Sequence, residues 1–127
     1  MYSEVEKLSS ALRGLGVGKG DRVAGFMPNI PEAVIAMLAT TSIGAIWSSS
    51  SPDFGIKSVT DRFSQIEPKV IFSASAYLYN GKTFSSTKKL QKIIKELPTI
   101  EKIIIVDYLN TKPNYSEIPN AIDYSKL

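Results

Sequence analysis

The chain has 127 residues, a formal net charge of +3, 43% hydrophobic residues and 21% charged residues. These values are typical of one globular domain and argue against a chain that is disordered throughout. The sequence contains no cysteine and no histidine, which excludes disulfides, thiol nucleophiles, Ser-His-Asp triads and zinc sites with the usual ligands.

The first residues of the sequence predict a helix followed by a buried strand. Apolar residues recur at spacings of 3, 4 and 3 between Val5 and Leu15, which places them on one face of a helix. Gly16 stands where that helix would end. Residues 22–27 are a short apolar run between turn residues, a pattern typical of a buried strand.

A second helix is expected between Asn29 and Gly44. Asn29 is a suitable N-cap, and Pro31 suits the first turn of a helix. The helix body at residues 33–38 is apolar on every face, which predicts packing on both sides. A second short strand is expected at residues 45–49.

The same alternation continues in the second half of the chain. Apolar spacings of 3, 4 and 3 predict an amphipathic helix at 56–66, followed by a strand at 69–75. A further helix is expected at 90–97 and a fourth strand at 102–108. Between the third strand and that helix, Asn80-Gly81 is a strong signal for a hairpin or tight turn.

Continuous apolar strands that alternate with helices indicate an α/β fold, with a mostly parallel sheet and helices on both faces. Residues 1–109 carry this pattern and are expected to form one partial subdomain. Residues 110–127 hold two prolines, three asparagines and isolated apolar residues. We expect them to be an irregular tail or a truncated connection.

Four glycines at alternate positions around Lys19 resemble a phosphate-binding loop in composition. A P-loop, however, lies between a strand and a following helix, and here a helix precedes the glycines and a strand follows them. Only three residues separate Gly14 from Gly18, whereas the P-loop motif needs four. We therefore interpret the stretch as a helix C-cap and a turn, in which glycines supply positive φ.

Two other loops are candidate binding sites. Residues 48–57, SSSSPDFGIK, follow a strand at its carboxyl end, where ligands bind in open α/β sheets. Pro52 and Asp53 equally suit the start of the next helix, so both interpretations remain open. The turn Tyr79–Lys82 could place a lysine and backbone amides against an anion, although the residues alone favour an ordinary turn. No catalytic residue and no metal site is predicted.

The motifs GDRVAGFMPN, AMLATTSIGAIWSSSSPDFG, DRFSQIEPK and YNGK together point to a family. In order and spacing they resemble the N-terminal region of adenylate-forming acid–CoA ligases, most of all the acetoacetate-activating members. The resemblance implies part of the large N-terminal domain of that fold. It also implies a reaction in which ATP and acetoacetate, with Mg²⁺, give an acyl-adenylate and pyrophosphate, and coenzyme A then gives the thioester.

The resemblance also implies a fragment and one binding site. The family's phosphate loop and the catalytic lysine of its mobile C-terminal domain do not occur here, so the chain is expected to be inactive alone and to bind no cofactor tightly. In related acetyl-CoA synthetases, the loop corresponding to Tyr79–Lys82 contacts coenzyme A through two arginines around a glycine. Lys82 stands at the second arginine position and Tyr79 replaces the first, with Asn80 and Gly81 between them. Asp53 begins a helix near the same region in relatives.

Two alternatives remain open. The chain could be a non-catalytic nucleotide- or coenzyme A-binding module, or an interaction module, derived from the ligase domain. It could also be a flavodoxin-like protein, although it lacks a convincing glycine-rich strand-to-helix loop. The small positive charge comes without a nucleic-acid motif, so no nucleic-acid partner is expected. The amino terminus does not resemble a signal peptide, and the longest apolar run, 33–39, is too short to span a bilayer, so we expect a cytoplasmic location.

Overall fold

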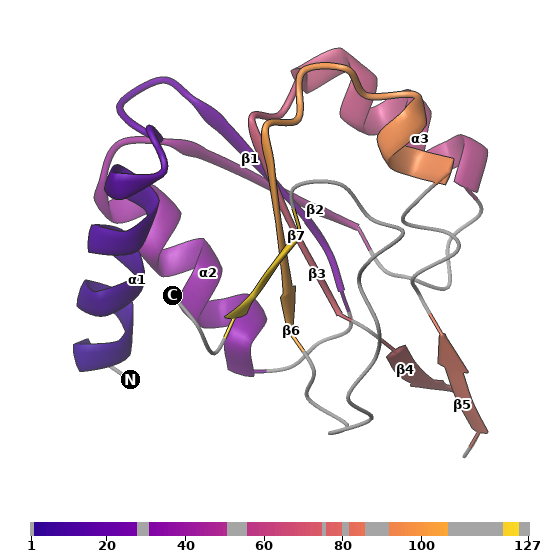
Figure 1. Cartoon of the computed structure of the whole chain (residues 1–127), viewed down its shortest axis with the longest axis horizontal. Helices are drawn as coiled ribbons and strands as arrows, with labels where there is room; N and C mark the ends of the chain where they lie inside the picture. Colours follow the sequence, from indigo (N-terminus) through magenta and orange to yellow (C-terminus); the bar gives the residue numbers. More distant parts are fainter. Residues whose placement is uncertain are drawn as a thin grey trace.

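The computed structural model describes residues 2–27, 31–50, 56–74, 76–79, 82–85, 92–106 and 121–124. Helices and strands alternate along the chain, as the sequence predicts (Figure 1). The elements are α1 (Tyr2–Gly14), β1 (Arg22–Phe26), α2 (Pro31–Ser42), β2 (Ile46–Ser50), α3 (Ile56–Ile66), β3 (Val70–Ala74), β4 (Ala76–Tyr79), β5 (Lys82–Ser85), β6 (Lys102–Val106) and β7 (Ala121–Asp123).

Five strands form one sheet in the order β2-β1-β3-β6-β7, and every pair in it is parallel. The strands β4 and β5 form a separate antiparallel pair. The predicted α/β fold with a mostly parallel sheet is therefore confirmed. The second helix begins at Pro31, as expected, whereas its proposed N-cap, Asn29, lies outside the described residues. Of the helix expected at 90–97, residues 92–95 are helical in the described part.

Both faces of the sheet are apolar because helices cover both of them. On one face, residues such as Val23 and Phe72 join a buried cluster with α1 and α2. On the other face, alternate residues such as Ala24 and Ile71 join a cluster with α3 and the helical residues 92–95. Successive side chains of a strand point to opposite faces, so each of the three central strands, β1, β3 and β6, contributes to both clusters. Figure 1 shows α1 and α2 on one side of the sheet and α3 on the other.

Trp47 of β2 lies across the neighbouring strand β1. A Cβ atom built on Gly25 would lie only 2.5 Å from Cζ2 of the indole. The indole also meets the ring of Phe72 in β3 edge to face, with ring centroids 6.0 Å apart. Gly25 therefore provides the space that lets an aromatic side chain of the edge strand reach over β1 to β3.

The strand β7 lies within the segment for which the sequence pattern predicts no element. It pairs with β6 in parallel, with Ile104 opposite Ile122. Ala121 packs against the α3-side cluster, and Tyr124, which follows the strand, packs against the α1–α2 cluster. The expectation of an irregular segment from 110 onward therefore needs correction at residues 121–123.

The helix α2 also differs from its prediction. Ile35, Ala36, Ala39 and Thr40 are buried, as expected for an apolar helix. The opposite face is open to solvent within this chain, because Val34, Met37 and Leu38 remain 36–38% exposed. The predicted packing on both sides is thus wrong for the chain by itself. Among the residues that the structure describes, no helix has both the length and the apolar character that crossing a bilayer requires.

Candidate functional site

The carboxyl ends of the parallel strands mark the edge of the sheet at which ligands are expected. The strands β2 and β3 lie on either side of β1 and end at Ser50 and Ala74. Because the three strands are parallel, the chain leaves both of them at the same edge. The two loops that the sequence singles out therefore start at one edge of the sheet, separated only by β1. Asp53 belongs to the first of these loops and lies outside the described residues.

The second loop is the β4–β5 hairpin. Tyr79 and Lys82 are directly opposite each other in the antiparallel pair, with two residues joining the strands. The hairpin predicted from Asn80-Gly81 is therefore confirmed, although these two residues themselves lie outside the described part. The structure thus brings the backbones of Tyr79 and Lys82 together at the end of the hairpin.

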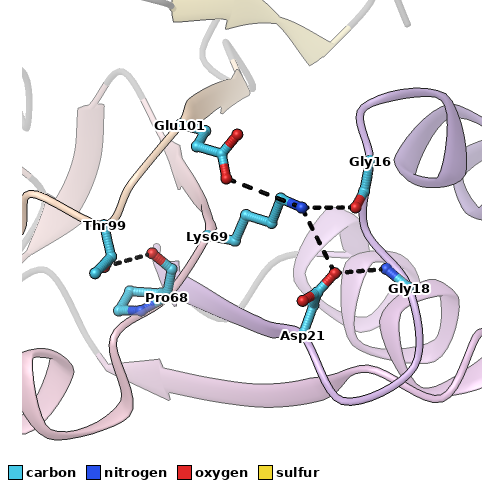
Figure 2. Close-up of polar contacts among 7 residues, drawn as sticks. All are labelled: Gly16, Gly18, Asp21, Pro68, Lys69, Thr99 and Glu101. Atoms are coloured by element: carbon cyan, nitrogen blue, oxygen red, sulfur yellow. Dashed lines mark hydrogen bonds and ion pairs between the residues drawn. The ribbon is translucent and has the colours of Figure 1, made fainter.

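The glycine-rich stretch lies at the opposite, amino edge of the sheet, just before β1. Gly16 and Gly20 have φ values of 92° and 85°, as the interpretation as a helix end and a turn requires. The Gly18 N–H donates to the Asp21 carboxylate at 2.8 Å (Figure 2). The Asp21 backbone N–H in turn donates to the Gly18 carbonyl at 3.1 Å. The polar groups of Gly18 and Asp21 thus bond each other within the turn. The interpretation of the stretch as a turn rather than a phosphate loop is therefore confirmed.

Lys69 connects this turn to the rest of the amino edge. Its ammonium donates to the Gly16 carbonyl at 2.7 Å and lies 3.7 Å from the Asp21 carboxylate and 3.9 Å from that of Glu101 (Figure 2). Its backbone N–H donates to the Arg22 carbonyl, so the same residue also links the starts of β3 and β1. We interpret this cluster as a structural clamp, because every group in it faces another group of the chain.

A cavity of about 350 Å³ lies between α1, α2 and the residue that follows β7. Apolar side chains and several ionisable groups, among them Glu4, Lys7, Glu32 and Tyr124, line it. Burial raises the pKa of the Tyr124 hydroxyl above its usual value of 10.0, and the carboxylates of Glu32 and Glu4 add to the shift. No local sequence pattern predicts this cavity, because the residues that line it lie far apart in the chain.

The described part of the chain contains no group of three or more acidic residues that could hold a metal ion. It also contains no predicted catalytic residue.

Comparison with known proteins identifies similar sequences and a similar structure. A sequence profile of the family described as "AMP-binding enzyme" matches residues 1–124. The chain is 53% identical over 124 residues to the acetoacetyl-CoA synthetase of Macaca fascicularis, covering 96% of this chain and 18% of that protein. It is 52% identical over 98 residues to the acetoacetyl-coenzyme A synthetase of Rhizobium meliloti (strain 1021), covering 76% of this chain and 15% of that protein.

The structure is similar to that of the acetoacetyl-CoA synthetase from Streptomyces lividans. The two superpose with a TM-score of 0.90 and 42% sequence identity, over 98% of this chain and 19% of that one. The chain thus spans about a fifth of the length of the relatives it matches.

Proposed function

Because the chain belongs to the AMP-binding enzyme family, we propose that it is part of an AMP-forming acetoacetate–CoA ligase. This membership confirms the resemblance that the sequence motifs indicate. The observation that best supports the proposal is the TM-score of 0.90 to an acetoacetyl-CoA synthetase across 98% of the chain. The activity belongs to the longer protein, since the chain matches only 19% of that structure.

The proposed reaction activates a carboxylate, which is a poor electrophile because its negative charge is delocalised. ATP supplies the AMP leaving group, and the thiol of coenzyme A then displaces AMP to give acetoacetyl-CoA. The glycine-rich turn does not fit the ATP phosphates, because the Gly18 N–H is already bound to Asp21. The described residues also do not fit Mg²⁺, since they contain no cluster of acidic ligands. We therefore assign ATP and Mg²⁺ to other parts of the protein.

Coenzyme A is the substrate that we assign to this chain. Its phosphates are anionic, and a lysine beside turn amides is a suitable partner for such groups. We propose that Tyr79, Asn80, Gly81 and Lys82 contact coenzyme A, with Asp53 nearby. Two findings support this assignment. Tyr79 and Lys82 are paired across the hairpin, and the Asp53 loop leaves the same sheet edge as the chain that leads to the hairpin.

The domain organisation follows from the same proposal. We propose that residues 1–109 form a partial N-terminal subdomain of the ligase and that residues 110–127 connect it onward, with β7 added to the subdomain's sheet. A cytoplasmic location remains a prediction from the sequence.

Two assays test the proposal. The isolated chain, mixed with ATP, Mg²⁺, acetoacetate and coenzyme A, should release no pyrophosphate above background, and robust release would overturn the claim that other segments are required. Calorimetric titration of the isolated chain should give only weak binding of coenzyme A or nucleotide. Tight binding together with cooperative unfolding would favour the non-catalytic module.

The coenzyme A site can be tested in a chimaera that carries this chain in place of the matched region of the Streptomyces lividans enzyme. Lys82→Ala should raise the KM for coenzyme A by about tenfold, the effect of losing one charge-assisted hydrogen bond. Lys82→Arg should retain the wild-type value, and Lys92→Ala, which removes an exposed lysine elsewhere, serves as the matched control. An unchanged KM for Lys82→Ala would refute the assignment.

A further inference from the structure

The cavity between α1, α2 and Tyr124 combines apolar and charged lining groups. Leu8 of α1 and Ile35 of α2 are both buried, and we call these two side chains the cavity floor. Figure 1 shows that β7 ends beside the two helices, and Tyr124 follows this strand in the chain. The cavity volume of about 350 Å³ lies within the range of sites that bind small molecules.

Charged groups of both signs line the cavity around this floor. Glu4 and Lys7 lie one turn apart on α1 and are exposed, and Glu32 in the first turn of α2 is partly buried. In the described part of the chain every ion pair involves Lys69, so these three groups do not neutralise one another. Two negative charges and one positive charge therefore face the same cavity.

Tyr124 adds a hydroxyl near both carboxylates. Burial raises the pKa of this hydroxyl, and the negative charges of Glu32 and Glu4 raise it further. Both carboxylates therefore lie within electrostatic reach of the phenolic oxygen. The hydroxyl stays protonated at neutral pH and accepts hydrogen bonds through its lone pairs. Three groups with oxygen acceptors thus face one part of the cavity, which matches the three N–H donors of an ammonium group.

We propose that this cavity binds a zwitterionic α-amino acid with an aliphatic side chain. The ammonium of the ligand lies among the carboxylates of Glu4 and Glu32 and the hydroxyl of Tyr124. The carboxylate of the ligand pairs with Lys7, and its side chain packs on the cavity floor. The inference goes beyond the proposed function and does not depend on it, because it rests on the groups that line the cavity.

Ligands that carry a single charge are poorer matches. A carboxylate without an ammonium meets two like charges, those of Glu4 and Glu32. An amine without a carboxylate meets the like charge of Lys7. The cavity floor favours an aliphatic side chain over a polar one, because filling the floor removes apolar surface from water.

Titrations followed by saturation-transfer difference NMR test the proposal with L-leucine and two analogues that each lack one charge. L-leucine should bind the chain with a dissociation constant on the order of 1 mM, as expected for so small a ligand. Isoamylamine lacks the carboxylate and isocaproate lacks the ammonium, and each should bind at least about tenfold more weakly. Equal affinity for the three ligands, or no binding of L-leucine, would overturn the proposal.

Two variants test where the ligand binds. Lys7→Met should weaken the binding of L-leucine about tenfold without weakening that of isoamylamine, whereas Glu32→Gln should weaken both. The matched controls Lys92→Met and Glu6→Gln make the same charge changes at exposed residues outside the cavity and should leave both affinities unchanged. Circular dichroism checks that each variant is folded. An equal loss of affinity in a variant and in its matched control would contradict the site.

The same titrations on the chimaera test the cavity within the longer protein. Binding of L-leucine that again depends on Lys7 would support the proposal. Loss of binding in a folded chimaera would overturn it, in favour of a cavity that further polypeptide fills. If the isolated chain does not fold, the titrations on the chimaera decide alone. Pyrophosphate release by the chimaera is measured separately, so a failure of the proposed function is distinguished from a failure of this inference.

Discussion

Replacing Gly25 with alanine should destabilise the chain through one contact. The added Cβ would lie 2.5 Å and 2.6 Å from two ring carbons of Trp47, whereas carbon atoms prefer separations of about 3.5–4.0 Å. The indole would have to move by about 1 Å, and its contact with Phe72 leaves little room for that shift. Gly25 has no positive φ, so alanine fits the backbone and the cost is one of packing.

The size of the effect follows from two opposing terms. Overpacking a core costs about 1–3 kcal/mol, and replacing glycine inside a strand recovers about 0.5–1 kcal/mol. We therefore expect Gly25→Ala to lower the free energy of unfolding by about 1–2 kcal/mol. Urea unfolding measures this value, with the fluorescence of the single tryptophan as the signal.

Two controls separate the clash from a general effect of alanine. Gly18 has no positive φ and no atom within 4 Å of a built Cβ, so Gly18→Ala should change stability by less than about 0.5 kcal/mol. In a Trp47→Leu background, followed by circular dichroism, Gly25→Ala should become nearly neutral. A Gly25→Ala chain as stable as the wild type, or the same loss in both backgrounds, would refute the reasoning.

Two further predictions concern the clamp and the cavity. Lys69→Met removes a hydrogen bond to Gly16 and two ion pairs from a partly exposed side chain, so it should cost about 1 kcal/mol in urea unfolding, and less in high salt. The same cost for Lys92→Met would contradict a specific role for the clamp. Because the folded chain raises the pKa of Tyr124 above 10.0, it holds the phenolic proton more tightly than the unfolded chain does, and stability should fall as the pH rises past about 10. Tyr124→Phe should weaken that fall, and an ultraviolet pH titration should lose one tyrosine whose pKa lies above 10.0; an unchanged titration would contradict this assignment.

Local patterns in the sequence were enough to predict most of the fold. The spacing of apolar residues predicts α1 and α3, and continuous apolar runs predict β1, β3 and β6. The order of elements around the glycine-rich stretch was sufficient to reject a phosphate loop, since a helix end and a turn need only local geometry. Asn80-Gly81 similarly predicts the hairpin from two residues.

The features that the sequence did not predict depend on distant partners. β7 has three residues and forms by pairing with β6, so no local run marks it. The role of Lys69 comes from groups in two other segments of the chain. The apolar residues of α2 predict packing on both sides of the helix. Within this chain, however, only one side of α2 is covered by other residues.

The candidate site was predicted from resemblance, and the structure tests only the backbone of its hairpin. Tyr79 and Lys82 are opposite each other at the hairpin end. Asp53, Asn80 and Gly81 lie outside the described residues, so their roles remain predictions. A coenzyme A site also needs the ligand and its other contacts, which no local sequence pattern specifies.

Acetoacetate-dependent pyrophosphate release by the chimaera tests the central proposal most directly. If this chain is part of an acetoacetate–CoA ligase, the chimaera should release pyrophosphate with ATP, Mg²⁺ and acetoacetate at a rate close to that of the parent enzyme. Replacing acetoacetate with acetate should reduce the rate in both enzymes to the same extent. A folded chimaera that binds ATP and coenzyme A but releases no pyrophosphate with acetoacetate would contradict the account.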